Sequence, residues 1–413
     1  MGVFSVFGGG DKGKGDSGGA YYRRLSIRFT ICKFSCLLLL ILVVLYGFSF
    51  RTDEINMDNF RYLFNSAGSD NTQVQSYRTL YFDSSDSNRF ALVRGDLAVV
   101  NNSGSAVYGL GGERKSADST LRMDDPHVIS SAKFMYIYDL GGTELVVKNT
   151  LETVSTLRFP YAIRDAVAAD GGYFAVVSSE KTTRSTIFVY DDRYREVYKC
   201  SFGSQYTLSV DLNEDATQLI TASVYSKDGI FVTAVELFSL SEKKALSSYS
   251  FEGEYPYRVY FTEDGGFMLM TDAGLRIIDS KGDGVAFLEF GDLGIDNYYM
   301  DGNCFIKQYS PATMSAEEFL EYYDASGKLV YENSYANGIR HVSRNGNYLF
   351  VISGSTMYMV RLSDGTVKET EAAENVLDTV FLEDGKVLIL TAGTGSVLEY
   401  EKLFDEKITE VSE

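Results

Sequence analysis

Adjacent carboxylates are the residues of this sequence that could most directly do chemistry. The pairs are Asp191-Asp192, Glu263-Asp264 and Glu317-Glu318. Two carboxyl groups that face each other can cleave a glycosidic bond, one as acid and the other as base or nucleophile. Most of these pairs lie in short polar segments, where an aspartate accepts hydrogen bonds from the turn backbone. The pattern favours structural turns, so no catalytic residue is assigned. Glycan cleavage by carboxylates that folding brings together is kept as the alternative function.

Metal and nucleophile chemistry have little support in the sequence. The chain has two histidines, His127 and His341, and its four cysteines show no zinc-ligand spacing. Residues 279–284, DSKGDG, resemble the start of a calcium loop but lack the further ligands and the closing glutamate. Neither histidine has a nucleophile motif to pair with. We therefore expect no metal site and no cofactor.

Tyrosine and arginine recur in five segments that each lead into an apolar stretch. The segments are RFPYAIRD (158–165), GSQYTLS (203–209), GEYPYRVY (253–260), DNYYMD (296–301) and NSYANGIRH (333–341). Because Tyr and Arg are enriched at binding hot spots, these segments are candidates for a ligand or partner surface. The candidate binding residues are Tyr161, Arg164, Tyr206, Tyr257, Arg258, Tyr298 and Arg340.

Two of these arginines have the same spacing to the next turn. Arg164 lies six residues before Asp170, and Arg258 lies six residues before Asp264, so a shared register is predicted. The alternative interpretation of the whole set is structural. In that case the tyrosines pack between sheets and the arginines pair with neighbouring carboxylates.

The elements that must position these residues repeat along the chain. Short turn segments, mostly Asp-Gly or Asn-Gly, precede apolar stretches at 94–96, 124–126, 170–172, 214–215, 264–266, 301–302, 345–346 and 384–385. Their average step of about 41 residues is typical of a β-propeller blade. One four-stranded sheet cannot bury both faces, so such sheets stack until a ring closes.

The predicted fold class is therefore all-β, a β-propeller of about eight four-stranded blades. Seven blades remain possible, because the second unit is poorly separated from the first. An array of β-sandwiches would need linkers, and the sequence has no Pro- or Ser-rich break after residue 77. The last unit has three strands, and the segment Tyr77–Phe82, YRTLYF, precedes the first complete blade. We predict that this segment supplies the missing outer strand and closes the ring.

An apolar segment near the N-terminus predicts a membrane anchor. Residues 31–50 contain one charge, Lys33, and match the length of about 20 residues that crosses a bilayer. Arg23, Arg24 and Arg28 precede this segment, so the positive-inside rule places the N-terminus in the cytoplasm and the propeller outside. The expected location is the cell membrane, with the lipid bilayer as a partner of residues 31–50. A cleaved signal peptide is the alternative.

The expected organisation follows from these segments. A disordered basic cytoplasmic tail covers 1–28, a transmembrane helix 29–50, a juxtamembrane stalk 51–76, the propeller 77–405 and a C-terminal tail 406–413. The formal net charge of −19 excludes nucleic acid as a partner, because phosphates require clustered Lys and Arg. An acidic body of this kind also repels anionic lipids and polymers unless cations intervene.

Several of these features together resemble a known group of proteins. The basic N-terminus, the apolar span, the segment INMDNFRYLF and Tyr-Asp hairpins at 138–139, 190–191 and 323–324 are similar to an uncharacterised family of membrane-anchored propellers of Gram-positive bacteria. The ring itself resembles WD40-like and quinoprotein-dehydrogenase-like propellers. This chain has no tryptophan, whereas WD40 blades carry Trp-Asp pairs and the dehydrogenases carry tryptophan docking motifs. The resemblance therefore transfers no cofactor and no catalytic residue.

The function expected from the sequence is that of a binding scaffold. A membrane-tethered, extracytoplasmic propeller would bind an unidentified protein or a cell-envelope ligand through the loops around its channel mouth. Whether the protein is an enzyme stays open, with an inclination against it.

Overall fold

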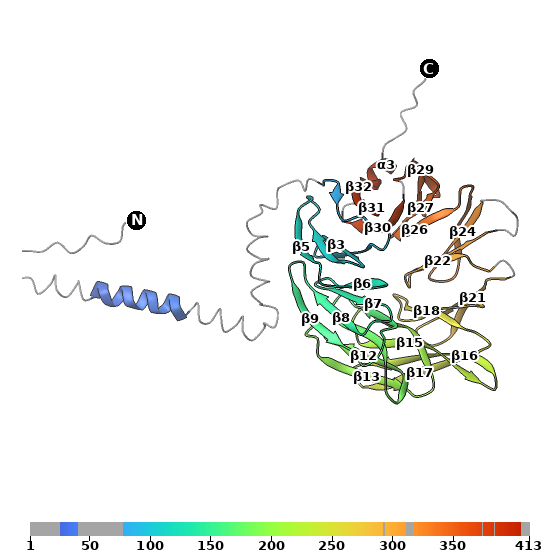
Figure 1. Cartoon of the computed structure of the whole chain (residues 1–413), viewed down its shortest axis with the longest axis horizontal. Coiled ribbons are helices and arrows are strands. Elements are labelled where there is room, and N and C mark those ends of the chain that lie inside the picture. The colour runs from blue at the N-terminus through green and yellow to red at the C-terminus, as the bar shows by residue number, and fades with distance from the viewer. Residues whose placement is uncertain are drawn as a thin grey trace, which may run out of the picture. The chain divides into compact units, whose positions relative to one another are not determined.

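The structure is a computed structural model that describes residues 25–39, 77–291, 294–310, 317–373, 375–383 and 385–405. The chain divides into two compact units, Met1–Gln73 and Val74–Glu413. In the first unit, residues 25–39 are helical. The second unit holds the strands of the described residues and carries the candidate site (Figure 1).

The described strands form eight sheets of four strands each, which we call blades 1 to 8. Blade 1 contains β2 (Arg89–Val93), β3 (Asp96–Asn101), β4 (Gly104–Tyr108) and β5 (Arg114–Asp118). Blade 2 contains β6 (Pro126–Ser130), β7 (Met135–Asp139), β8 (Glu144–Lys148) and β9 (Thr153–Arg158). Blade 3 contains β10 (Asp165–Ala168), β11 (Phe174–Glu180), β12 (Thr183–Tyr190) and β13 (Glu196–Phe202). Blade 4 contains β14 (Tyr206–Leu212), β15 (Gln218–Lys227), β16 (Ile230–Ser239) and β17 (Lys244–Glu252).

The second half of the unit repeats the same pattern. Blade 5 contains β18 (Pro256–Phe261), β19 (Phe267–Thr271), β20 (Gly274–Ile278) and β21 (Gly284–Glu289). Blade 6 contains β22 (Asn297–Met300), β23 (Cys304–Tyr309), β24 (Glu318–Asp324) and β25 (Leu329–Tyr335). Blade 7 contains β26 (Ile339–Asn345), β27 (Tyr348–Ser353), β28 (Thr356–Arg361) and β29 (Thr366–Glu371). Blade 8 contains β30 (Val376–Leu382), β31 (Lys386–Thr391), β32 (Thr394–Glu399) and β1 (Leu80–Tyr81), and the short helix α3 (Tyr400–Asp405) follows it.

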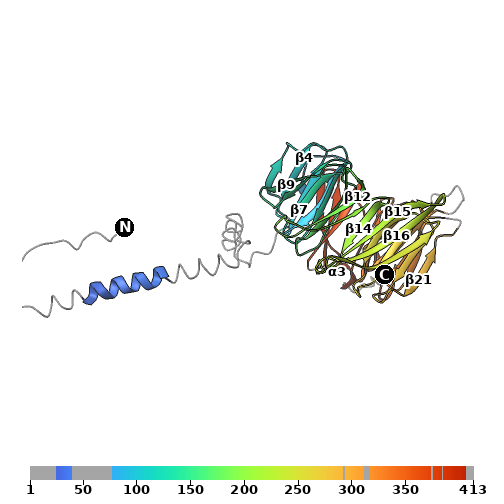
Figure 2. The ribbon, with the colours of Figure 1, turned by 90° about the horizontal axis from the view of Figure 1, so that it is seen from below.

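The blades form a propeller, as the sequence predicts, and they number eight. In Figure 1 the first strands β6, β18, β22, β26 and β30 lie nearer the centre, and β5, β9, β13, β17 and β21 lie at the rim. Figure 2 shows the strands of successive blades running obliquely past one another. Burial follows position within a blade: the second strand of blade 5 is buried along its length, whereas the fourth strand of blade 7 alternates with solvent. The second strand of blade 5 is covered by the neighbouring blades on both faces, which is why it is continuously apolar.

Blade 2 is separate from blade 1, which removes the seven-blade alternative. Its first hairpin turn, however, is not the segment 124–126 that the repeat suggested. Residues 124–125 lie before β6, and Pro126 is its first residue. The turn between β6 and β7 is residues 131–134, where the amide of Ser131 donates to the carbonyl of Phe134. This turn has no Asp-Gly or Asn-Gly pair. The sequence signal for the second unit was therefore misplaced.

The ring closes as predicted, by pairing the earliest strand with the last one. In β1, Leu80 pairs with Gly395 and Tyr81 with Thr394. Leu80 is 1% exposed and packs in one cluster with Leu388 and Leu390. The strand has two residues rather than the six of the predicted segment, because the chain turns to blade 1, where the amide of Arg78 donates to the carbonyl of Leu110.

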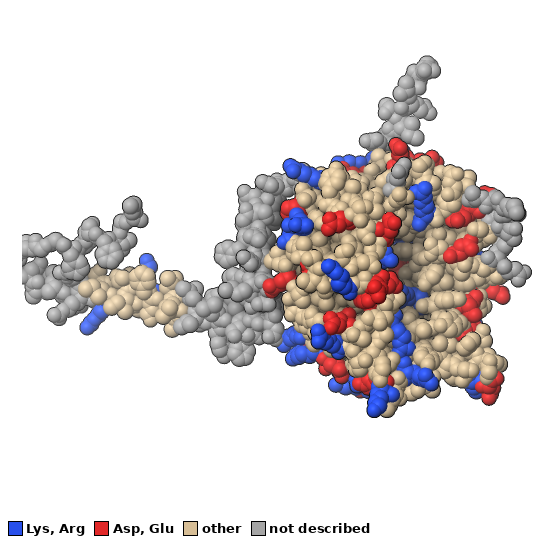
Figure 3. Space-filling view, in the orientation of Figure 1, with Lys and Arg blue, Asp and Glu red and all other residues tan. Residues whose placement is uncertain are grey.

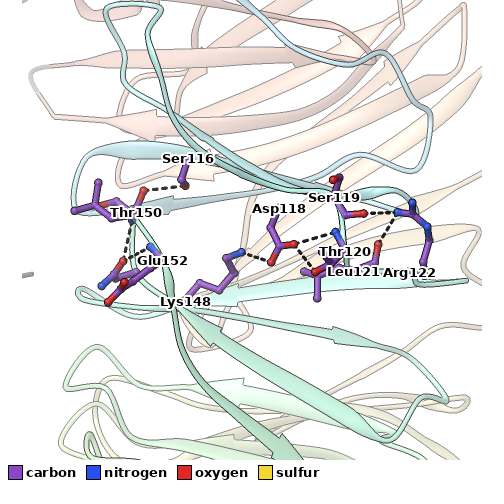
Figure 4. A network of polar contacts seen from close by, with 11 residues as sticks. Ser116, Asp118, Ser119, Thr120, Leu121, Arg122, Lys148, Thr150 and Glu152 are labelled. Carbon is purple, nitrogen blue, oxygen red and sulfur yellow. Dashed lines mark hydrogen bonds and ion pairs between the residues drawn. The ribbon is translucent and has the colours of Figure 1, made fainter.

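Polar contacts add to the apolar packing between blades, as blades 1 and 2 show (Figure 4). Lys148 at the end of β8 is 4% exposed, and its ammonium lies 2.8 Å from a carboxylate oxygen of Asp118 in β5. The hydrogen bonds from Lys148 and Thr120 hold the pKa of Asp118 at about 2. The hydroxyl of Ser116 also donates to the carbonyl of Thr150. The acid thus stays charged while it joins the two blades.

Two of the Tyr-Asp hairpins, at 190–191 and 323–324, form the outer turn of a blade, between its third and fourth strands, whereas Asp139 ends the second strand of blade 2. In blade 6, the carboxylate of Asp324 accepts the amides of Ser326 at 2.9 Å and Lys328 at 3.0 Å. Asp279 accepts two turn amides in the same way, so the segment that resembles a calcium loop is a hairpin turn. Asp191 does so in blade 3. The recurrent aspartate is therefore a structural residue of these turns.

The N-terminal helix differs from the predicted transmembrane helix. Among the described residues, no helix is long and apolar enough to cross a membrane. Residues 25–39 overlap the start of the predicted span, and residues 40–50 lie outside the described part of the chain. The described residues therefore give the predicted transmembrane helix no support.

Candidate binding surface at the mouth loops

The five predicted segments all lead into the first strands of blades, namely β10, β14, β18, β22 and β26. We call them the mouth loops. In blades 4 and 5 the first strands lie side by side, because the amides of Val259 and Phe261 donate to side chains of Ser209 and Asp211. The equal spacing of these contacts shows that the two strands run parallel, so their mouth loops lie at the same end of the ring.

Arg258 has a structural partner two blades away. Its guanidinium lies 3.0 Å from a carboxylate oxygen of Asp165, the first residue of β10, and Asp165 also accepts the amide of Val210 in β14. Burial alone would lower the pKa of Arg258, but the charge and hydrogen bond of Asp165, together with the neighbouring tyrosines, outweigh it and raise that pKa. Burial raises the pKa of Asp165, and Arg258 opposes the rise. Arg258 therefore pairs with a carboxylate, as the structural alternative to a binding role predicted.

The predicted shared register of Arg164 and Arg258 is wrong by one residue. Both hairpins have five residues between their first two strands, but Asp170 is the second residue of one turn and Asp264 the third of the other. In the ladders, Asp165 pairs with Val177 at the position where Arg258 pairs with Met270. Arg164 therefore corresponds to Tyr257. A shift of one residue turns a side chain to the other face of its strand.

Arg164 and Tyr206 come together with a residue that the sequence did not indicate, Arg184. The Arg164 guanidinium lies 5.8 Å from the centre of the Tyr206 ring, and the Arg184 guanidinium lies 5.3 Å from it. Arg184 donates to the Tyr206 hydroxyl at 2.6 Å. Burial lowers the pKa of Arg164, an effect that Tyr206 opposes. Among the described residues, neither arginine has a carboxylate partner.

An aromatic row lies along the mouth loop of blade 5. The rings of Phe231 and Tyr255 are 6.1 Å apart, and those of Tyr255 and Tyr257 are 5.9 Å apart. Phe231 is 60% exposed and Tyr257 47%. The amide of Gly253 donates to the carbonyl of Phe231 at 2.7 Å, which holds the loop against β16.

The sequence reasoning missed Arg184 and Phe231 because it considered one kind of loop. Both residues lie next to the turn between the second and third strands of a blade. In a four-stranded antiparallel sheet, that turn and the loop before the first strand lie at the same end. The position of these turns in the predicted repeat was the signal that could have found them.

The remaining predicted residues are distributed around the ring. Tyr161 is 45% exposed in the loop between β9 and β10, and Tyr206 is 42% exposed at the start of β14. Tyr298 is half-buried in β22. Arg340 is exposed in β26, and no contact among the described residues joins it to the others.

The buried carboxylates serve the inner wall of the ring. Asp211 accepts the amide of Phe261 at 2.8 Å, and burial raises its pKa to about 7. Of the adjacent acid pairs, Asp264 accepts bonds from its own turn, and Glu318 accepts the amide of Ile339 at 2.7 Å. These contacts give the acids structural roles.

The two histidines have packed positions. In β26, Nε2 of His341 lies 3.0 Å from the hydroxyl of Thr379, which donates to the hydroxyl of Ser343. Burial lowers the pKa of His341 to about 4, so the ring is neutral near pH 7. The ring of His127 stacks on Tyr138 at 5.4 Å. Neither contact set has the geometry of a catalytic triad.

A family comparison identifies the chain's relatives. The model of a family of unknown function, DUF5711, matches residues 69–399. The chain belongs to this family. A comparison with curated proteins found no match.

Several solved structures are similar to the propeller. BamB from Moraxella catarrhalis is 13% identical with a TM-score of 0.51, over 78% of this chain and 98% of that one. The dihydro-heme d1 dehydrogenase NirN, in complex with DHE, is 14% identical with a TM-score of 0.54, over 78% of this chain and 73% of that one. The C-terminal WD40 domain of Sif2 is 11% identical with a TM-score of 0.52, over 77% and 97%. At these identities the likeness extends to the fold alone.

Proposed function

We propose that this DUF5711 protein is a scaffold that binds a protein or cell-envelope partner through the mouth loops. We also propose that residues 31–50 tether it to a membrane with the propeller outside the cell. The observation that carries the binding proposal is the surface formed by Tyr161, Tyr206 and Tyr257, which are between 42% and 47% exposed at one end of a rigid ring. Exposed tyrosines on a fixed framework bind partners at low entropic cost.

Two further features support binding over catalysis. Arg164 and Arg184 lie beside this surface without a carboxylate among the described residues. The acids that the glycan-cleavage alternative would use hold turns and inner strands together. The alternative therefore has less support than the scaffold.

A pull-down with matched variants tests the binding proposal. The full chain would be expressed in its own cells as wild type, as the double variant Tyr206→Ala/Tyr257→Ala, and as Leu329→Ala. Leu329 is 41% exposed beside the turn between β24 and β25, the third and fourth strands of blade 6, at the other end of the blade. We expect a cross-linked partner with the wild type and the Leu329 variant and none with the double variant. A partner that the double variant retains would place the binding site elsewhere.

The tether is tested separately. A reporter enzyme that is active only outside the cytoplasm is fused after the last residue of the full chain, and the membrane fraction is assayed. Activity in that fraction, and its loss to the medium when residues 31–50 are deleted, is the expected result. An inactive reporter in intact cells would contradict the proposed orientation.

A further inference from the structure

Arg164, Arg184 and Tyr206 form a cluster whose charge is not balanced. Several other arginines of the ring have acids beside them: Arg258 lies 3.0 Å from Asp165, and Arg361 lies 2.7 Å from Asp364. The chain has 57 acidic and 38 basic residues, so acids are abundant. The guanidiniums of Arg164 and Arg184 lie 5.8 Å and 5.3 Å from the centre of one ring and have no carboxylate partner among the described residues, so they differ from these paired arginines.

Both guanidiniums are held in place by neutral groups. Nη2 of Arg164 donates to the carbonyl of Ser178 at 2.8 Å, to the hydroxyl of Ser179 at 2.7 Å and to the carbonyl of Arg184. Nη1 of Arg184 donates to Tyr206. A guanidinium has five N–H donors. Among the described residues these bonds use one terminal nitrogen of each arginine, so other donors are left for an acceptor from outside.

Two cations that are held in fixed positions are suited to binding an anion. The side chains lose little freedom on binding because the strand ends of β11 and β12 already orient them. An anion bound beside these cations would also offset the repulsion of two like charges. Hydrogen bonds between a guanidinium and an anionic oxygen are about twice as strong as neutral ones.

The surroundings favour the carboxylate of a peptide over a polyanion. The tyrosines at positions 161, 206 and 257 and the exposed Phe231 border the mouth of blades 3 to 5. A nucleic acid or phosphate polymer requires a long row of cations, whereas this body is strongly acidic. Figure 3 shows basic side chains along a hollow near the centre of the visible ring face. A short segment with one or two carboxylates and aromatic neighbours matches these features.

We propose that Arg164 and Arg184 are a carboxylate subsite for an acidic, aromatic peptide segment of the partner. Its aromatic side chains pack on Tyr206 and the row formed by Phe231, Tyr255 and Tyr257. The carboxylate belongs to an Asp or Glu side chain or to a chain terminus, which present the same group. This inference rests on the proposed binding function and specifies the chemistry of the partner.

Fluorescence anisotropy with the purified chain tests the subsite. The probe is a fluorescein-labelled amidated peptide with the sequence Gly-Ser-Phe-Glu-Phe-Ser-Gly. A second peptide has Gln in place of Glu, a third has Ser in place of each Phe, and a fourth has the Gln sequence ending in a free carboxylate after Phe. We expect the Glu probe to bind at least about tenfold more tightly than the Gln probe. Binding of the fourth peptide distinguishes a chain terminus from a side chain.

Variants test whether the tighter binding of the Glu probe depends on the two arginines. Arg184→Ala and Arg184→Gln should weaken the Glu probe about tenfold and leave the Gln probe unchanged. Arg361→Ala is the matched control, because Arg361 lies 2.7 Å from Asp364, beside the turn between β28 and β29 at the other end of a blade. It should leave both probes unchanged. Arg164→Ala is informative only if its melting temperature stays near that of the wild type, and the Arg184 variants keep the test valid if it falls.

Several outcomes would overturn the inference. One is that the Glu and Gln probes bind equally, or that neither binds. Another is that millimolar inorganic phosphate displaces the Glu probe while acetate does not, which would indicate a phosphate site. If the double variant Tyr206→Ala/Tyr257→Ala loses the cellular partner while the probes show no carboxylate preference, the scaffold proposal stands and the subsite fails. If that variant keeps the partner, the scaffold proposal itself fails.

Discussion

Arg258 of blade 5 and Arg164 of blade 3 come from the same kind of segment, but the structure gives them different surroundings. Arg258 reaches Asp165, which is 6% exposed, and joins the inner wall of the ring across blade 4. Arg164 binds carbonyls and a hydroxyl beside Tyr206, and among the described residues it has no acid. Arg164 is half-buried, and Tyr257, the residue that aligns with it, is 47% exposed.

The different surroundings of the two arginines follow from a shift of one residue in strand register. At the position of Asp165 and Arg258 the side chain is turned to the inner wall, where an unpaired charge is costly and a partner is required. At the position of Arg164 and Tyr257 the side chain lies at the mouth surface. The amino-acid type of a loop residue is therefore not enough to predict its role. The register of the strand that follows the loop determines on which face the side chain lies.

Removing Arg258, the structural arginine, should give the largest loss of stability. In Arg258→Ala, the carboxylate of Asp165 is left buried and unpaired. We expect a loss of about 3 kcal/mol in the free energy of unfolding, the lower end of the range for such a change, since Arg258 is partly exposed. Urea denaturation of the propeller measures it, with Arg158→Ala as the control.

A double variant sharpens this result. In Asp165→Asn/Arg258→Gln the pair carries no charge, and the side-chain oxygen of Asn can still accept from the amide of Val210. The loss should be smaller than in Arg258→Ala, because no buried charge is left without a partner. A double variant that is less stable than the single one would mean that the pair is not coupled in the way described.

Asp211, a buried residue of the same inner wall, should make the stability of the propeller depend on pH. Burial raises its pKa from 3.8 to about 7, so the folded state binds the proton more tightly than the unfolded state does. The Asp211 contribution to stability is therefore complete below pH 4 and is lost as pH rises to about 7. The slope is at most about 1.4 kcal/mol per pH unit.

Asp211→Asn is the matched variant for this slope. Its amide oxygen can still accept the amide of Phe261, but it does not titrate. Between pH 4 and 7 the wild type should lose stability relative to this variant, as measured by thermal melts at closely spaced pH values. If the melting temperatures of the wild type and the variant changed in parallel between pH 4 and 7, a raised pKa for Asp211 would be contradicted.

The exposed arginine should give the smallest effect on stability. In Arg184→Ala the hydrogen bond to the Tyr206 hydroxyl is lost at the surface, and we expect a change of less than about 0.5 kcal/mol. Urea denaturation under the conditions used for Arg258→Ala allows direct comparison. A loss as large as that of Arg258→Ala would remove the contrast between the two regions and assign the mouth arginines to the framework.

The sequence was sufficient for the architecture and insufficient for the site. The turn spacing, the apolar strands and the segment containing Leu80 led to eight blades and a closed ring. They did so because blade stacking depends on periodic patterns that a single chain displays. The second turn was misplaced because residues 131–134 have no Asp-Gly or Asn-Gly pair. The role of Arg258 could not be predicted, since its partner Asp165 lies in another blade and is found only after folding.

The short strand β1 also has a consequence for the order of events during synthesis. Leu80 leaves the ribosome before the other strands of the described propeller, and its partner Gly395 lies in β32, the last of these strands to emerge. Blade 8 cannot be completed until then, so the nascent ring has two open sheet edges until β32 emerges. Unpaired edges recruit strands from other chains. The interval before β32 pairs with β1 is therefore when this ring is most exposed to misassembly.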